Sequence, residues 1–208
     1  QAFFDPATWT VSYVVSDNAS RAAAIVDPVL DFDFKSARTS TRSADRVLAY
    51  VRERGLKVEW ILETHAHADH LSAAPFLQQR TNAPVAIGAG IRRVQAHFSG
   101  IFGFEPGYQA DGAPFDRLFA DGERFALGNL EVEAIATPGH TSDSLSYRIG
   151  DAVFVGDSIF MPDGGTARCD FPGGDAEVLY RSIQRLYALP DATRVFVCHD
   201  YGPGGREV

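Results

Sequence analysis

Short apolar runs separated by turn residues dominate the hydrophobic pattern of this chain. Residues 10–15 alternate polar and apolar side chains, and residues 22–26 form a continuous apolar run. Together the two segments predict a hairpin or strand pair at the start of the sequence. Later runs predict a buried strand at 58–62 and further strands at 84–87, 130–136, 144–149, 152–155 and 194–198.

Helical spacing of apolar residues occurs in three segments. Ser43 is positioned to cap a helix whose apolar residues run from Ala44 to Val51, and Gly55 is positioned to end it. Residues 72–80 predict a second helix. Asp175 predicts the start of a third helix, whose apolar face is formed by Leu179, Ile183 and Leu186.

Two segments lack a regular period. Residues 27–42 are rich in Asp, Ser and Thr and predict a loop. Residues 96–122 contain repeated Gly and Pro and predict a long surface excursion beside the functional site. Strands and helices are otherwise mixed, without an internal repeat. The pattern therefore predicts a sheet-containing core covered by helices, and it leaves the topology open.

Composition narrows the class of protein. A length of 208 residues fits one large domain over residues 1–208, and a net charge of −8 argues against a nucleic-acid surface. No apolar run approaches the ~20 residues of a membrane helix. The first twenty residues lack a secretion signal, although a removed leader stays open because the chain begins at Gln1. We therefore expect a cytoplasmic protein that binds neither nucleic acid nor membrane.

The cationic residues and the cysteines bear on the substrate and on disulfide bonding. Lys35 and Lys57 are the only lysines, so almost all positive charge is arginine, whose planar fork favours carboxylates and hence an acidic small-molecule substrate. Two cysteines, Cys169 and Cys198, are too few for a disulfide scaffold and are most simply interpreted as buried apolar residues.

Five of the six histidines gather with two aspartates in four short segments. Neutral imidazole and carboxylate are the groups that bind zinc and ferrous iron, and their placement after apolar strands puts them on loops held by a rigid sheet. The alternative is a set of polar loops whose histidines are packed or solvated without binding a metal. The recurrence of such histidines in four separate segments argues against it. The candidate ligands are His65, His67, Asp69, His70, His140, Asp157 and His199.

These segments closely resemble the motifs of the metallo-β-lactamase superfamily. Residues 65–70 read His-Ala-His-Ala-Asp-His and match its HxHxDH signature, while Pro138-Gly-His140, Gly156-Asp157 and His199 match its later motifs. The resemblance implies an α+β fold, an αββα sandwich with the metal site at one edge between the two sheets. In the family the fold continues beyond the last histidine, so whether a C-terminal segment or a fused domain is missing stays open.

Residues 63–70 and 164–173 are similar to one branch, the persulfide dioxygenases or sulfur dioxygenases, in their bacterial β-lactamase-like form. That branch oxidises glutathione persulfide with dioxygen to glutathione and sulfite. The resemblance implies one Fe(2+) per chain, held by His65, His140 and Asp157, in a cytoplasmic enzyme of sulfide detoxification that we expect to be a homodimer. The other candidate ligands would then surround the iron without binding it: His67, Asp69, His70 and His199.

The same resemblance suggests a substrate-binding group. Arg168, with Tyr180 on the following helix, would receive glutathione carboxylates, and Asp170 would orient Arg168. Surface ion pairing is the alternative for Arg168 and Asp170, and core packing the alternative for Tyr180. The branch commonly carries threonine at the position of Cys169, so the role of this thiol is unknown.

Two other functions compete with this interpretation. All seven positions of the two-metal form are present, so the chain could be a hydrolase similar to glyoxalase II, with two Zn(2+) ions cleaving a glutathione thioester through a bridging hydroxide. The absence of a substrate-binding region after His199 argues against that enzyme. The second alternative is a non-catalytic metal or persulfide sensor that uses an exposed cysteine of lowered pKa.

Overall fold

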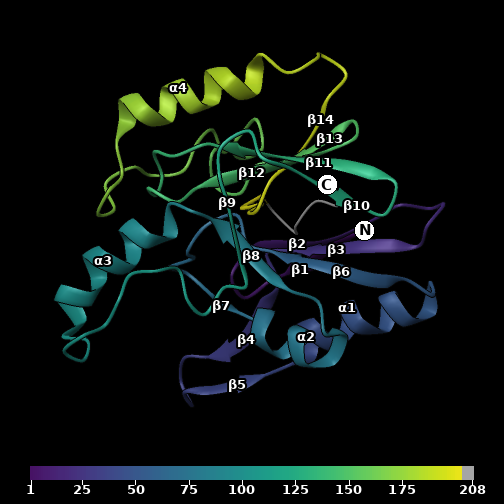
Figure 1. The fold of residues 1–208 in the computed structure, drawn as a ribbon, viewed down its shortest axis with the longest axis horizontal. Helices are drawn as coiled ribbons and strands as arrows, with labels where there is room; N and C mark the ends of the chain where they lie inside the picture. Colours follow the sequence, from purple (N-terminus) through teal and green to yellow (C-terminus); the bar gives the residue numbers. More distant parts are fainter. Residues whose placement is uncertain (203–208) are drawn as a thin grey trace.

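Two β-sheets pack face to face, and helices cover both outer faces, in the computed structural model that describes residues 1–202 (Figure 1). The αββα layering and the α+β class expected from the sequence are confirmed. The first sheet has the order β1-β2-β3-β6-β8-β9, and the second has the order β10-β11-β12-β13-β14. Helices α1 and α2 lie on the first sheet and α4 lies on the second.

The fourteen strands of residues 1–202 belong to three sheets. The first sheet contains β1 (Ala2–Asp5), β2 (Thr10–Ser16), β3 (Ala22–Val26), β6 (Lys57–Leu62), β8 (Val85–Gly88) and β9 (Arg117–Phe119). The second sheet contains β10 (Arg124–Leu127), β11 (Leu130–Ala136), β12 (Leu145–Ile149), β13 (Ala152–Phe154) and β14 (Arg194–Phe196). A small third sheet contains β4 (Val29–Asp33), β5 (Arg38–Ser40) and β7 (Leu71–Ser72).

The helices are α1 (Arg42–Glu53), α2 (Ala74–Thr81), α3 (Ile91–Phe102) and α4 (Ala176–Tyr187). None of the helices within residues 1–202 has the length and apolar character needed to cross a membrane.

Alternation along each strand builds the core in layers. In β3, Ala22, Ala24 and Val26 face the second sheet, whereas Ala23 and Ile25 face α1 and α2. All five residues are buried, which explains why β3 has a continuous apolar run. The predicted pairing of β2 with β3 is confirmed and is antiparallel.

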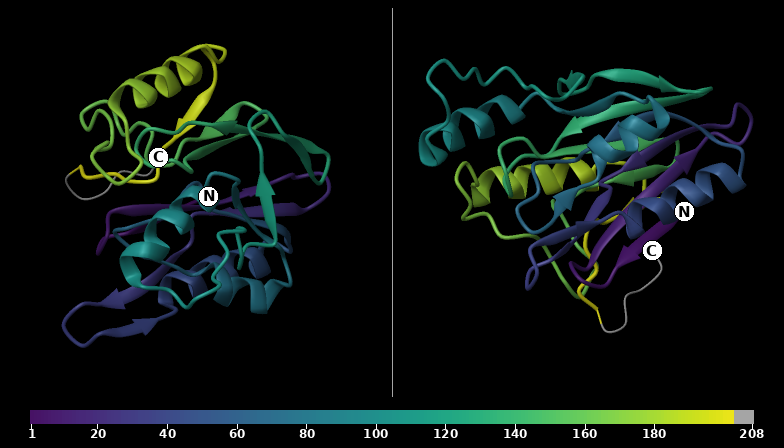
Figure 2. Two further views of the ribbon diagram at one scale, coloured as in Figure 1. Left: turned by 60° about the vertical axis from the view of Figure 1, so that its left-hand side comes forward. Right: turned by 90° about the horizontal axis from the view of Figure 1, so that it is seen from below.

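The predicted loop at 27–42 is wrong, because these residues form the β4–β5 hairpin, which extends away from the two large sheets (Figure 2). β4 also pairs with β7, a contact that the local pattern does not contain. Ser43 was expected to cap α1, but the capping position is Thr41. Asp31 of β4 instead accepts hydrogen bonds from the backbone N–H and the hydroxyl of Ser43, at 2.9 Å each.

The predicted irregular excursion at 96–122 is also only partly right. α3 continues through Phe102 and ends at Gly103, which has a left-handed φ of 61°. β9 then adds to the edge of the first sheet. By contrast, the start of α4 at Asp175 is confirmed, since its carboxylate accepts the backbone N–H of Val178 at 2.9 Å.

The edge that carries the candidate ligands is joined across the two halves of the chain. Thr10 at the start of β2 forms an isolated bridge with His199, and the backbone N–H of Val11 donates to the carbonyl of Cys198 at 2.7 Å. The backbone N–H of Leu145 likewise donates to the carbonyl of Thr64 at 2.8 Å. These backbone contacts therefore join the two sheets next to the candidate ligands.

Candidate metal centre

The ends of four strands deliver the candidate ligands to one edge. β11, β13 and β14 run in the same direction, because β12 is antiparallel to both β11 and β13 and β14 is parallel to β13. Their carboxyl ends lead into His140, Asp157 and His199, respectively, while β6 of the first sheet leads into His65. Rigid strands thus hold ligands that lie far apart in the sequence.

His65, His140 and Asp157 form one compact group. The Nε2 atoms of His65 and His140 lie 3.7 and 3.6 Å from Oδ2 of Asp157. All three residues are buried, and one ligand atom from each lies within 4.8 Å of the others. Two imidazoles and one carboxylate in this arrangement can bind one divalent ion and leave positions open for other ligands.

Hydrogen bonds fix the orientation of both imidazoles. Nδ1 of His140 donates to the carbonyl oxygen of Arg168 at 2.6 Å, and Nδ1 of His65 lies 3.0 Å from the hydroxyl of Thr64. Because the carbonyl oxygen can only accept, His140 carries a proton on Nδ1, and its Nε2 faces Asp157. Support of this kind from a second layer of groups is typical of metal-binding histidines.

The electrostatics of the group suit a bound cation. Burial and the neighbouring histidines hold the pKa of His65 well below its usual range, and burial raises the pKa of Asp157. Oδ1 of Asp157 is buried without a hydrogen-bond partner in the described part of the chain. A divalent ion would supply the charge and the partner that these atoms lack, so the residues fit the ferrous ion that the sequence resemblance implies.

Asp69, His70 and His199 form a second candidate group. Nε2 of His199 lies 3.2 Å from Oδ2 of Asp69 and 3.6 Å from Oδ1 of Asp157. Asp157 therefore faces the first group with one oxygen and His199 with the other. Burial lowers the pKa of His70 to about 4, so its imidazole is neutral at pH 7. These residues could hold a second ion.

His67 has different partners. Its Nε2 lies 3.2 Å from Oδ1 of Asp27 and 3.3 Å from Oε2 of Glu63, and it is not part of the compact group around His65. Burial would lower the pKa of His67, but the two carboxylates outweigh burial and raise it well above its usual range. The structure thus separates His67 from the group that His65 forms with His140.

The sequence pattern did not single out three buried acids that support the ligand loops. Asp27 accepts hydrogen bonds from the backbone N–H and the hydroxyl of Thr64, at 2.7 and 2.9 Å. Glu63 accepts one from the hydroxyl of Ser72, and Asp143 accepts the backbone N–H of Ala66 at 2.8 Å. The available signal was an acid directly after an apolar run: Asp27 follows the apolar strand β3, and Glu63 follows the apolar end of β6.

The expected substrate-binding residues lie on the α4 side of the centre. Arg168 forms a two-pronged ion pair with Asp170, with distances of 2.6 and 2.7 Å, which lowers the pKa of Asp170 to about 2. Arg168 also stacks over the ring of Phe171. Tyr180 is 64% exposed on α4, so core packing does not account for it.

The two cysteines differ sharply. Cys198 is 1% exposed, and burial together with nearby carboxylates raises the pKa of its thiol well above the usual range. This burial argues against Cys198 as a reactive sensor thiol. Cys169 is partly exposed in the Arg168 loop.

Comparison with known proteins identifies the family. Residues 10–199 match the model of the metallo-beta-lactamase superfamily. A "Probable metallo-hydrolase" of Burkholderia pseudomallei is 51% identical and covers 100% of this chain and 74% of its own length. A "Beta-lactamase hydrolase-like protein" of Agrobacterium fabrum is 54% identical over 99% of this chain, which spans about half of that relative, 48% of its length.

Three further relatives carry more specific names. "Glyoxylase B2" of Dictyostelium discoideum is 49% identical over 96% of this chain and 69% of its own length. The mitochondrial "Persulfide dioxygenase ETHE1" of Bos taurus is 29% identical over 95% of this chain and 66% of its own length. The crystal structure of ETHE1 from Myxococcus xanthus superposes with a TM-score of 0.79 and 34% identity, covering 99% of this chain and 76% of that one. The chain belongs to the metallo-beta-lactamase superfamily.

Proposed function

We propose that the protein is a dioxygenase that uses one Fe(2+) per chain to oxidise glutathione persulfide to glutathione and sulfite. In the balanced reaction, one persulfide, one dioxygen and one water give one glutathione and one sulfurous acid. The S–S bond breaks, and the terminal sulfur is oxidised while dioxygen is reduced. The named similarity to ETHE1 proteins supports this proposal.

The observation that carries the proposal is the compact group of His65, His140 and Asp157, from which His67 is separated by its contacts with Asp27 and Glu63. Two histidines and one carboxylate are typical of non-haem iron oxygenases. A bound ferrous ion would supply the redox chemistry that brings the persulfide sulfur and dioxygen to react. Asp157 offsets one of its two charges, which leaves one for the persulfide anion to balance.

Other residues bind and orient. Arg168 would hold a carboxylate of the glutathione part, and Asp170 would orient its guanidinium through the two-pronged contact. Tyr180 offers an exposed hydroxyl on the adjacent helix. Nε2 of His199 points between Asp69 and Asp157 and is placed to hydrogen-bond a ligand at the centre. No protein nucleophile is required.

Metal analysis combined with oxygen uptake tests the proposal. Protein prepared without air is expected to contain about one iron per chain and to consume dioxygen with glutathione persulfide, releasing sulfite. Two zinc ions per chain, with no oxygen uptake, would overturn it. The expectations of a homodimer and of a cytoplasmic location stay predictions, and light scattering after size-exclusion chromatography tests the first.

A two-zinc thioester hydrolase is the second candidate. It is favoured by the group of Asp69, His70 and His199 and by the two-sided placement of Asp157, which could bridge two ions. The name of the Dictyostelium relative points the same way. Hydrolysis of a glutathione thioester by the zinc-loaded protein, at a rate that exceeds persulfide oxidation by the iron-loaded protein, would select this candidate.

A further inference from the structure

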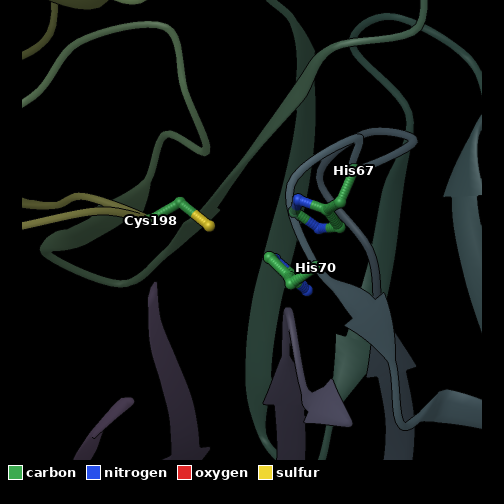
Figure 3. Close-up of side chains that lie close together, drawn as sticks. All are labelled: His67, His70 and Cys198. Carbon is green, nitrogen blue, oxygen red and sulfur yellow. The ribbon is translucent and has the colours of Figure 1, made fainter. Parts of the chain in front are cut away.

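The thiol of Cys198 lies close to two histidines of the HxHxDH segment, His67 and His70. Ligand atoms of Cys198, His67 and His70 lie within 4.8 Å of one another, and the sulfur is directed toward the two imidazole rings (Figure 3). The rings lie side by side, with centroids 4.2 Å apart and planes inclined by 31°. The proposed function uses neither this sulfur nor these two nitrogens as iron ligands.

Each imidazole has one nitrogen engaged and one free. Nε2 of His67 contacts Asp27 and Glu63, and Nδ1 of His70 lies 3.2 Å from the carbonyl oxygen of Leu71. Within the described residues, Nδ1 of His67 and Nε2 of His70 are buried without a hydrogen-bond partner. Buried unpaired nitrogens require an explanation, because native proteins seldom leave such atoms unsatisfied.

The engaged nitrogens have the partners that metal-binding histidines need. Metal-ligating imidazoles usually donate the other ring N–H to a carboxylate or a backbone carbonyl, which fixes the ring and its tautomer. His67 has carboxylates and His70 has a carbonyl in that place. The His67 side chain is only 3% exposed, so the ring is held firmly in this orientation.

We propose that Cys198, His67 and His70 form a binding site for a thiophilic divalent cation such as zinc, distinct from the His65–His140–Asp157 group. On binding, the S–H bond of Cys198 and the Nδ1–H bond of the charged His67 ring break, both protons pass to solvent, and the metal forms bonds to the sulfur and to that nitrogen. Thiolate with imidazole favours zinc over harder ions. Tetrahedral zinc requires sulfur–nitrogen separations of about 3.6 Å, so from separations of up to 4.8 Å the sulfur and the nitrogens need to approach by up to about 1.2 Å.

A neighbouring trio shares the same sulfur. Asp157, Cys198 and His199 also place ligand atoms within 4.8 Å of one another. Within residues 1–202, Nε2 of His199 and Nδ1 of His67 both lack a hydrogen bond. Nε2 of His199, however, lies 3.2 Å from Oδ2 of Asp69 and 3.6 Å from Oδ1 of Asp157, so carboxylates already compete with the sulfur for this nitrogen. The free nitrogens therefore favour His67 and His70 as the companions of the sulfur.

X-ray absorption at the zinc edge tests the site directly on the full chain. The zinc-loaded protein is expected to show one sulfur neighbour per chain at about 2.3 Å. Cys198→Ser should lose it, and Cys169→Ser, which changes the other cysteine, should keep it. A wild-type spectrum without sulfur, or a sulfur neighbour that persists in Cys198→Ser, overturns the proposal.

Cobalt(II) provides a second readout that does not depend on the folding of the Cys198 variant. The cobalt-loaded wild type is expected to show a near-ultraviolet sulfur-to-cobalt absorption band. His67→Ala and His70→Ala should each weaken cobalt affinity in that band at least tenfold, and His199→Ala should not. Loss of the band in His199→Ala alone assigns the sulfur to the other trio and overturns the proposal. His140→Ala, which removes an iron ligand, should keep the band, so failure of this site and failure of the dioxygenase proposal are distinguishable.

Discussion

Nδ1 of His140 donates a hydrogen bond of 2.6 Å to the carbonyl oxygen of Arg168. The contact joins a proposed iron ligand to the backbone of the loop that presents the proposed substrate-binding guanidinium. The ring of His140 also meets the ring of Phe171 edge-on, at 5.4 Å between centroids. The position of the loop and the orientation of the ligand therefore depend on each other.

Replacing His140 tests the iron assignment. His140→Ala is expected to reduce bound iron from about one per chain to nearly none and to abolish oxygen uptake, because one of three ligands is removed. Elemental analysis and an oxygen electrode measure the two effects. His97→Ala, which changes the histidine on α3 outside the candidate ligand set, is the control and should retain both. Full activity in His140→Ala would contradict the assignment.

Replacing Arg168 separates substrate binding from metal binding. Arg168→Ala is expected to raise KM for glutathione persulfide about tenfold or more, since a charged hydrogen bond contributes about 1.5–3 kcal/mol. The iron content should not change, because the carbonyl that orients His140 remains. The low pKa of Asp170, about 2, keeps the ion pair intact throughout an assay from pH 6 to pH 8. An unchanged KM would remove Arg168 from the substrate site.

Gly139 controls how closely helix α4 approaches the centre. A Cβ at this position would lie 2.3 Å from Cα of Leu179, and φ is +134°. Gly139→Ala should therefore cost more than about 3 kcal/mol in unfolding free energy and displace His140. Gly150→Ala is the matched control: its φ is also positive but its Cβ meets open space, so it should cost only about 1 kcal/mol. Equal urea midpoints for the two variants would contradict this explanation.

Asp27 stabilises the HxHxDH loop through contacts with Thr64 and His67. Asp27→Asn keeps the shape but replaces an accepting oxygen with a donating NH₂ group, opposite Thr64 and His67. We expect a loss of about 3 kcal/mol in unfolding free energy, the size typical of a broken buried charged pair. Asp33→Asn, at the exposed end of β4, is the control. If urea unfolding gives the two variants the same stability, the buried network does not stabilise the loop as inferred.

Asp17 should make stability depend on pH. Hydrogen bonds from the Ser20 hydroxyl and from the backbone N–H groups of Asn129 and Ala19 lower its pKa below the ordinary value. A lowered folded-state pKa means that Asp17 stabilises the fold above its unfolded pKa, near 4, and loses this effect as the pH falls further. Asp17→Asn should lower Tm by a few degrees at pH 7, with a smaller difference below about pH 4. Asp191→Asn is the control, and a gap that widens in acid would contradict the sign.

Local patterns predicted the elements whose apolar pattern is complete within one short segment. β2, β3, α1 and α4 followed from alternation, run length and helical spacing, because their buried faces are complete within each segment. The β4–β5 hairpin did not, since aspartates interrupt the apolar residues of β4, β5 is polar and exposed, and β4 also pairs with the distant β7. Helix α3 was also not predicted, because Ile101 and Phe102 are exposed and do not form a buried apolar face.

The candidate site was predicted better as a set of residue types than as a geometry. The motifs placed all seven candidate ligands near one edge, and the structure brings them into overlapping groups. The separation of His67 could not be predicted, because it depends on Asp27 and Glu63, which the sequence pattern did not connect to it. The approach of Cys198 to His67 and His70 is likewise a property of the assembled sheets.

The bridge between Thr10 and His199 has a consequence for how the protein matures. A growing polypeptide on the ribosome exposes the HxHxDH segment long before His140, Asp157 and His199 have been synthesised. Early capture of a stray ion by residues 65–70 would therefore occur on an unfinished chain. His65, His140 and Asp157 can therefore hold one ion together only after all three segments have been made and have packed at the same edge.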